Sequence, residues 1–211
     1  MGVKERRERE KAETREKILD AARELFLREG YDGVSMRKVA EMIEYSPTAI
    51  YVHFADKEQL FHELCQEDFG RLAATLQGAN LSPDPVKRIE QIGRTYIEFG
   101  LRFPNHYKLM FMTAHPEAEF DDSDREIKGN PERDAYAFLM QTILEAQHAG
   151  RFRDDLKDAE LIAQTLWGAV HGVISLHIAK ECDHWVEWRP MEERIEVMVS
   201  AILRGLLKEG R

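Results

Sequence analysis

Residues 36–54 read MRKVAEMIEYSPTAIYVHF, which predicts two short helices joined by a tight turn. Ser35 is placed to cap the first helix, and Ser46 followed by Pro47 has the pattern of an N-cap and first residue of the second. A longer apolar stripe upstream predicts a supporting helix that stops at Gly30. This order is typical of a helix-turn-helix, whose last helix enters the major groove of DNA.

The side chains of the second short helix suit contact with DNA. Ile50 and Phe54, four positions apart, would face the core, and short or aromatic hydrogen-bonding groups would face outward. Lys57 begins the following helix, where the partial positive charge of the helix end would help it to meet a phosphate. The residues predicted to contact DNA are Arg37, Ser46, Pro47, Thr48, Tyr51, His53 and Lys57.

The rest of the chain also predicts helices, so we expect an all-α fold. Asp56 followed by Gln59 resembles a capping box that opens a long fourth helix. The acidic run from Asp121 to Pro131 has the composition of a loop. We find no alternating strand pattern, no glycine-rich phosphate loop and no internal repeat. Further helices are expected at about residues 85–102, 104–114, 131–149, 155–182 and 190–209.

Composition narrows the class of protein. The 211 residues include 30 Lys and Arg against 39 Asp and Glu, a formal net charge of -9, so nucleic-acid binding would need a local basic face. The N-terminal segment KERREREKAE carries both positive and negative charges. It would either contact phosphates through Arg6, Arg7 or Arg9 or form a solvated, fraying helix. Two cysteines without a CxxC pair indicate a reduced compartment, and we expect a cytoplasmic protein.

One uncharged stretch, residues 161–179, is long enough for a membrane helix, and the spacing of Gly168 and Gly172 inside it would suit helix dimerisation. Polar side chains such as Gln164 and His171 interrupt this stretch, and no basic cluster flanks it. A soluble helix buried on several sides gives the same pattern. We therefore expect no membrane partner.

Residues 14–63 resemble the DNA-binding domain of TetR-family transcriptional regulators. The resemblance implies a homodimer that reads a pseudo-palindromic, double-stranded DNA operator with two such heads. It also implies that Tyr51 and Lys57 hold phosphates and that Ser46, Thr48 and His53 lie near base edges. The matching positions are Ile18, Ala21, Ala22, Leu25, Phe26, Gly30, Tyr31, Ser35, Val39, Ala40, Ser46, Ile50, Tyr51, His53, Phe54, Lys57, Glu58 and Leu60.

One position departs from this family pattern. Glu44 occupies the turn where the family often has glycine. We therefore expect a bulky acidic residue with left-handed backbone dihedrals close to the DNA. The departure leaves the operator sequence open and does not affect the expected fold.

Residues 85–209 resemble the family's ligand-binding half more loosely. The segments at residues 101–111 and 166–172 are similar to the WHG-type C-terminal subgroup, although Trp167 is separated here from the His-Gly pair. The resemblance implies a pocket for an unknown small-molecule effector, but aromatic and Met side chains at helical spacing are also typical of a plain core. The candidate pocket residues are Phe99, Phe103, Tyr107, Met110, Phe111, Phe138, Trp167 and His171.

The last two predicted helices, at 155–182 and 190–209, are apolar on more than one face. Such helices need a second partner besides their own domain, and small residues would let another helix approach closely. We expect a four-helix dimer interface, with two helices from each chain. Its candidate residues are Trp167, Gly168, Gly172, Ser175, Met198, Ile202, Leu203 and Leu206.

Together these features predict a three-helix helix-turn-helix head with its N-terminal arm at residues 1–56 and a helical effector-binding and dimerisation domain at 57–211. The expected function is a ligand-responsive transcriptional regulator, with repression the commoner role in proteins that the chain resembles. The alternative is a dimeric helical adaptor or small-molecule-binding protein without DNA binding. We expect no enzyme, because no nucleophile elbow, HExxH motif or paired carboxylates in an apolar setting are present. We expect no cofactor and no metal, since His62 and Cys65 share a helix face without further ligands.

Overall fold

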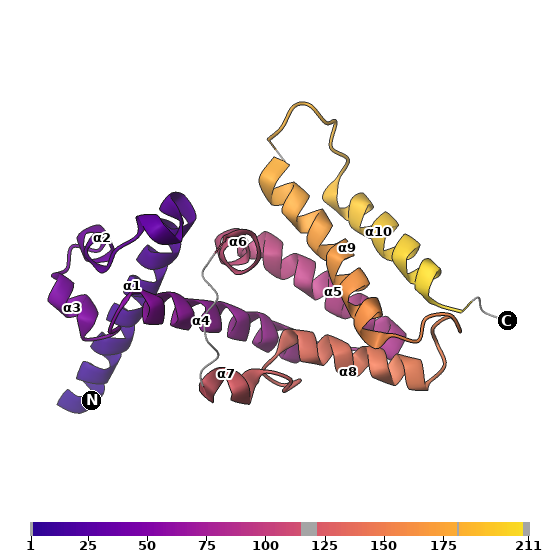
Figure 1. The fold of residues 1–211 in the computed structure, drawn as a ribbon, viewed down its shortest axis with the longest axis horizontal. Helices are drawn as coiled ribbons and strands as arrows, with labels where there is room; N and C mark the ends of the chain where they lie inside the picture. The colour runs from indigo at the N-terminus through magenta and orange to yellow at the C-terminus, as the bar shows by residue number, and fades with distance from the viewer. Residues whose placement is uncertain (1, 115–121, 181, 209–211) are drawn as a thin grey trace. The chain divides into compact units, whose positions relative to one another are not determined.

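The computed structural model describes residues 2–114, 122–180 and 182–208, and these residues form helices (Figure 1). Within them the extended pairing is an isolated antiparallel bridge between Phe152 and Leu207. The all-α prediction is therefore confirmed. The helices are α1 (Val3–Gly33), α2 (Met36–Met42), α3 (Pro47–Tyr51), α4 (Lys57–Gly78), α5 (Pro85–Arg102), α6 (Pro104–Met112), α7 (Asp122–Ile127), α8 (Ala135–His148), α9 (Ala159–Lys180) and α10 (Met191–Leu206).

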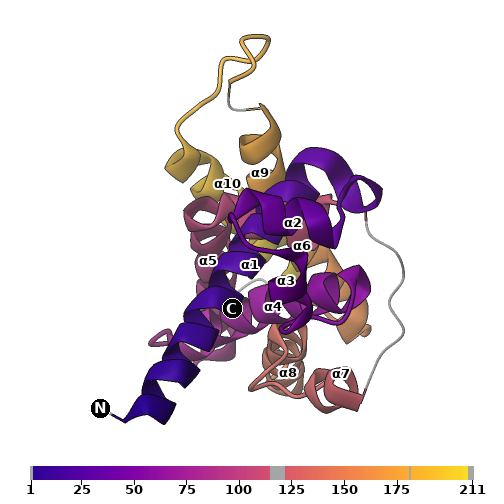
Figure 2. The ribbon, with the colours of Figure 1, turned by 90° about the vertical axis from the view of Figure 1, so that its left-hand side faces the viewer.

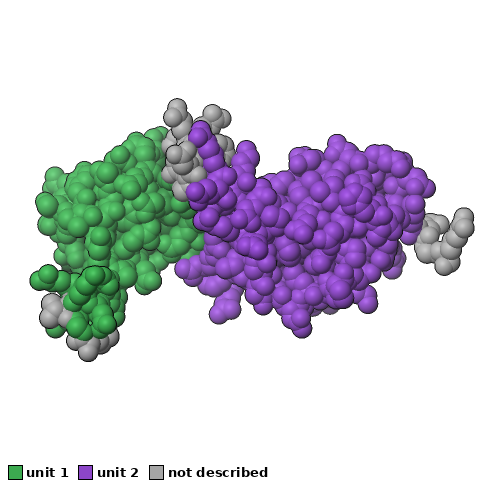
Figure 3. Space-filling model, turned by 90° about the horizontal axis from the view of Figure 1, so that it is seen from below, with its two compact units in different colours: residues 1–69, 105–119 green, residues 70–104, 120–211 purple. Residues whose placement is uncertain are grey.

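The chain divides into two compact units (Figure 3). Unit 1 contains residues Met1–Phe69 and Asn105–Glu119, and unit 2 contains Gly70–Pro104 and Phe120–Arg211. The chain passes from unit 1 to unit 2 within α4. The first turns of α4 belong to the apolar core of unit 1. The domain border expected at residue 56 stays a prediction.

The core of unit 1 joins α1, α2, α3, α4 and α6. Ile18 and Phe26 of α1, Ile50 of α3, Leu64 of α4 and Leu109 of α6 are completely buried in one cluster. Burying an apolar side chain of this size contributes about 1.5–3 kcal/mol. The helix-turn-helix is therefore stabilised by a core that it shares with α1, α4 and α6, and not by contacts between its two short helices alone.

A charged cluster lies inside the same unit. Asp68 of α4 is completely buried and accepts hydrogen bonds from Arg23 Nε at 3.2 Å and from Arg23 Nη2 at 2.8 Å. His106 of α6 places its Nδ1 2.8 Å from the same carboxylate. Burial alone would raise the pKa of Asp68, but the hydrogen bonds from His106 and Arg23 outweigh it and hold that pKa below its ordinary value. This cluster ties α1, α4 and α6 together.

The core of unit 2 joins α5, α8, α9 and α10, with α9 in contact with the other three. Ile143 of α8 and Ile162 and Ala163 of α9 are buried in its core. Asp84 caps α5 by accepting from the backbone N–H groups of residues 86 and 87, and Asp134 caps α8 in the same way. By length and composition alone, the α9 helix is apolar enough to cross a membrane, and it packs against α5, α8 and α10.

Local sequence signals gave most helix boundaries correctly. Ser35 and Ser46 cap α2 and α3, with their hydroxyls accepting from Lys38 N and Ala49 N at 3.3 Å each. The helix predicted to stop at Gly30 is only kinked there, where φ is 71°, and α1 continues to Gly33. Glu44 has a φ of 59°, which confirms the left-handed turn residue.

Other helix predictions were wrong. The helix expected from residue 155 begins only at Ala159. The acidic run expected to form a loop contains α7, and Asp124 near its start carries the negative charge that a helix N-terminus favours. Asp121 itself lies outside the described residues. The segment expected to be helical from residue 131 begins only at Ala135, because Asp134 caps the helix there.

Candidate nucleic-acid interface

The outward face of α3 is polar and exposed. Pro47 and Thr48 are exposed, and Tyr51 exposes 53% of its surface. Ile50 and Phe54, by contrast, are completely buried, as their spacing predicts. The short helix is thus anchored by one face and presents the other to any approaching duplex. Ser46, the cap residue, is exposed at the same end.

The cations of α2 are held at the surface by nearby acceptors. Arg37 Nε donates to Glu41 at 2.9 Å, and Lys38 Nζ donates to Glu29 at 2.6 Å and to the Gly33 carbonyl at 2.7 Å. Exposed pairs of this kind contribute little stability, about 0–1 kcal/mol. Arg37 would therefore lose little stability by exchanging Glu41 for another anion.

Lys57 is positioned by an aromatic ring at the start of α4. Its Nζ lies 4.1 Å from the ring centroid of Tyr31 and donates to the Tyr31 carbonyl at 3.1 Å. The Tyr31 ring is itself fixed, since it stacks on Phe26 at 5.7 Å and meets Phe61 edge-on at 5.2 Å. An ammonium has three donors, so Lys57 retains donors for a phosphate. Sequence reasoning missed this role of Tyr31, because the two residues meet only in the folded head.

His53 lies half-buried just beyond α3. Its Nδ1 is a buried atom without a hydrogen-bond partner in the described structure. Burial first, and then the charges of Lys11 and Arg15, lower the pKa of His53. The imidazole is therefore neutral at physiological pH, so His53 would meet DNA as a hydrogen-bonding group rather than as a cation.

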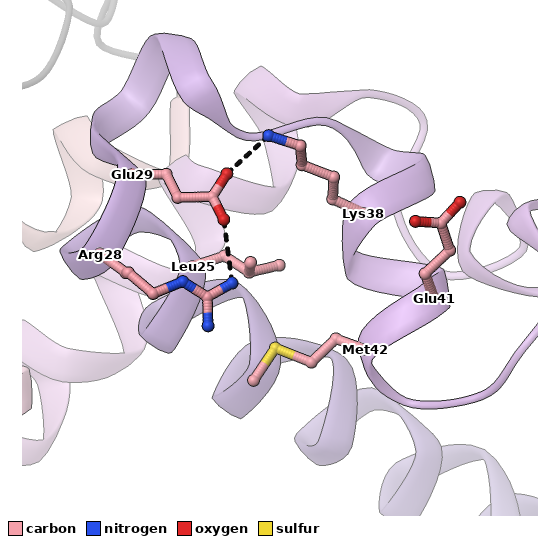
Figure 4. Close-up of a pocket in the computed structure, with 6 residues that line it drawn as sticks. All are labelled: Leu25, Arg28, Glu29, Lys38, Glu41 and Met42. Carbon is pink, nitrogen blue, oxygen red and sulfur yellow. Dashed lines mark hydrogen bonds and ion pairs between the residues drawn. The ribbon is translucent and has the colours of Figure 1, made fainter.

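A hollow of about 320 Å³ opens between α1 and α2 in unit 1 (Figure 4). Glu29 lies between Arg28 and Lys38 and pairs with both, at 2.9 and 2.6 Å. Glu41, which also lines the hollow, pairs with Arg37, so each lining charge already has a partner and the hollow offers no evident ligand chemistry. Its other lining residues are Leu25, Glu41 and Met42.

The predicted effector-pocket residues are distributed over both units, and this hollow contains none of them. Tyr107 and Met110 belong to unit 1 and are buried, and Phe111 of the same unit is half-buried. In unit 2, Trp167 is 39% exposed and donates its Nε1–H to the Tyr96 hydroxyl at 2.9 Å. The pocket therefore stays a prediction. The remaining candidates, all in unit 2, are Phe99, which is buried, and Phe103, Phe138 and His171, which are half-buried.

The predicted dimer-interface residues differ in exposure. Gly168 is exposed, whereas Leu206 is buried in the core of its own unit and Leu203 packs partly against that core. Gly172, Ser175, Met198 and Ile202 are half-buried. Sequence reasoning missed the most exposed apolar side chains on these helices: Leu161 (55%) and Leu176 (50%) on α9 and Val197 (70%) on α10. The exposure of these side chains depends on the packing of the bundle, which determines which of the apolar faces of each helix remains exposed.

Among the described residues, no group of three or more His, Cys, Asp or Glu side chains is arranged to hold a metal ion. Cys65 is half-buried, and burial is the first cause that raises the pKa of its thiol to about 12. Cys182 is exposed.

Comparison with known proteins identifies the family. Residues 18–64 match bacterial regulatory proteins of the tetR family, and residues 89–202 match the tetracyclin repressor-like C-terminal domain. The chain belongs to the TetR family of bacterial regulatory proteins. The narrower WHG-type subgroup stays a prediction.

Individual relatives support this membership. The chain is 43% identical over 63 residues to the HTH-type transcriptional repressor AcnR of Corynebacterium efficiens, a match that covers 30% of this chain and 34% of the relative. It thus spans about a third of the length of that repressor. It is 25% identical over 166 residues to the regulator UidR of Escherichia coli, covering 77% of this chain and 80% of UidR. A TetR family transcription regulator from Marinobacter aquaeolei VT8 shares the fold, with a TM-score of 0.75 over 97% of this chain and all of that chain at 16% identity.

Proposed function

We propose that the chain is a DNA-binding transcriptional repressor that acts as a homodimer in the cytoplasm and leaves its operator when a small molecule binds. The observation that carries DNA binding is the two-sided character of α3, in which Thr48 and Tyr51 are exposed and Ile50 is buried. Family membership supports this reading, because the match to the tetR family model spans the same helix.

The contacts would be of two kinds. Tyr51 and Lys57 suit the phosphate backbone, which fixes the register of the head on the duplex. Ser46 and Thr48 carry short hydroxyls at the N-terminal end of α3, the end that reads base edges in a helix-turn-helix. Arg37 adds a backbone contact from α2.

Dimerisation is proposed through α9 and α10. Leu161 and Leu176 on α9 and Val197 on α10 expose apolar surface, and exposed Gly168 leaves room for a partner helix. Large exposed apolar side chains on two neighbouring helices are typical of an association surface. Two copies would then present two recognition helices to one operator with two-fold symmetry.

Release by an effector is proposed to act through α4. This helix begins beside the recognition helix in unit 1 and continues into unit 2. An effector bound in unit 2 would favour a state in which the two heads no longer fit successive major grooves, about 34 Å or a multiple apart. The aromatic group of Trp167, Tyr96 and Tyr136 in unit 2 would suit a ligand with apolar surface and a hydrogen-bonding group.

Selection of bound fragments from the source genome, followed by affinity measurement over a range of salt concentrations, tests the proposal. The repressor account predicts enriched fragments whose affinity falls steeply with salt, and a Tyr51→Ala variant that binds them weakly while keeping wild-type helicity and dimerisation. Enrichment of no fragment by a folded dimer at low salt would contradict it and favour an adaptor without DNA binding.

A further inference from the structure

The first turns of α1 form an extension beyond the head. The helix begins at Val3, whereas its first buried residue is Ile18 and the family match also begins at residue 18. Every described side chain from Lys4 to Glu13 is exposed. Figures 1 and 2 show this end of α1 projecting past α2 and α3. The side chains of the extension from Lys4 to Glu13 therefore take no part in an apolar core.

The charges of this extension are only partly neutralised. Arg6 pairs with Glu10 at 2.7 Å and Arg9 with Glu13 at 3.6 Å, and Lys4 lies 4.0 Å from Glu8. Arg7 and Lys11 are in no ion pair within the described part of the chain. Among the described residues from Lys4 to Glu13, they are the two cations outside any ion pair.

Arg7 and Lys11 lie on one face of α1, and Arg15 continues the row. Residues four apart in a helix differ by about 40° in direction and by about 6 Å along the axis. Arg15 donates to Glu63 of α4 at 2.7 Å and lies 5.4 Å above the ring of Phe54, just after α3. The row therefore points to the side of the head on which α3 ends.

The electrostatics of His53 agree with this placement. After burial, the first cause, the charges of Lys11 and Arg15 also lower the pKa of His53, which is consistent with both cations lying on the His53 side of α1. Arg6 and Arg9 are turned by more than a quarter of a turn from this row. Like charges four residues apart destabilise an isolated helix by about 0.2–0.5 kcal/mol, so a polyanion would relieve a strain that the row otherwise carries.

We propose that the extension of α1 is a second DNA-binding surface, in which Arg7 and Lys11 contact phosphates beside the recognition helix. This inference rests on the proposed function and deepens it. Arg7 and Lys11 would supply the local basic face that DNA binding requires in a chain of net charge -9. Each phosphate contact contributes about 0.9 to the slope of log affinity against log salt, so two contacts contribute about 1.8 for each protomer.

The test compares Arg7→Gln/Lys11→Gln with a matched control, Arg6→Gln/Arg9→Gln. Both variants remove two positive charges from the same turns, and the control also breaks two ion pairs, so it loses at least as much helix stability. The probe is a labelled duplex recovered by genomic selection, with affinity followed by anisotropy between about 50 and 200 mM salt. Circular dichroism checks that both variants keep their helicity.

The inference predicts that Arg7→Gln/Lys11→Gln lowers the salt slope by about 1.8 for each bound protomer and weakens binding at least tenfold at about 100 mM salt. The control is expected to change the slope by less than half as much. Equal slopes for the wild type and Arg7→Gln/Lys11→Gln would overturn the inference while leaving the repressor account intact. A wild-type chain that binds no duplex in a salt-dependent way would overturn both.

Discussion

The buried carboxylate of Asp68 provides the sharpest stability prediction. Asp68→Asn is expected to lower the free energy of unfolding of unit 1 by about 3 kcal/mol, because removing one partner of a buried ion pair leaves the other charge uncompensated. Arg23 is only 5% exposed, and its remaining partner is Asp20, at 2.7 Å on the surface. That residual pair places the expected cost at the lower end of the usual range of about 3–5 kcal/mol.

Urea denaturation measures this loss. All three tryptophans lie in unit 2, so their fluorescence reports unit 2 while far-UV circular dichroism reports both units. For an m value of about 2 kcal/mol/M, the dichroism midpoint of unit 1 falls by roughly 1.5 M, and the fluorescence midpoint moves less. The matched control is Asp20→Asn, which removes the exposed partner of the same arginine and costs no more than about 1 kcal/mol. A loss below about 1 kcal/mol in Asp68→Asn would refute the reasoning.

The same carboxylate has a pH signature. The pKa of Asp68 is lower in the folded protein than in the unfolded chain, because the hydrogen bonds from His106 and Arg23 outweigh its burial. Its stabilising contribution is therefore complete above the unfolded pKa of about 4 and is lost as the pH falls through the lowered folded value. Wild-type and Asp68→Asn stabilities are expected to converge in acid, and a constant difference from pH 7 to pH 3 would contradict this.

Three further changes test other parts of the account. Tyr31→Leu removes the ring beneath Lys57 and should weaken DNA binding, measured by anisotropy, in the wild type but not in a Lys57→Ala background. An equal loss of affinity in both backgrounds would mean that Tyr31 does not act through Lys57. Glu44→Gly should raise the unfolding free energy by about 1 kcal/mol, since glycine adopts left-handed backbone dihedrals without a steric penalty. A lower melting temperature than that of the wild type would contradict this. Val197 is exposed, so Val197→Glu should give folded monomers in sedimentation. Leu203 packs against the core, so Leu203→Glu should also destabilise the bundle. A Val197→Glu protein that is still a dimer would place the interface elsewhere.

Features governed by neighbouring residues could be predicted from the sequence. The caps at Ser35 and Ser46, the break in helical geometry at Gly30 and the left-handed Glu44 each depend on backbone geometry within a few positions. The inward and outward faces of α3 follow from helical spacing in the same way. Local rules therefore sufficed for the helix-turn-helix.

Features that depend on tertiary packing could not be predicted. Arg23 and His106 lie 45 and 38 positions from Asp68, and no periodicity links them. Lys57 and Tyr31 are 26 positions apart and meet only when α4 packs on α1. The exposed face of α10 was also missed, because a helix with several apolar faces does not reveal which one its own bundle covers.

DNase footprinting on the DNA upstream of the gene that encodes this chain tests the central claim most directly, because regulators of this family often control themselves or a neighbour. The account predicts one protected site with two-fold symmetry, whose half-sites are centred about one helical turn of DNA or a multiple apart. Protection should fade as salt is raised. A folded dimer that protects no site there at low salt, and none among fragments selected from the genome, would contradict the claim that this head reads DNA.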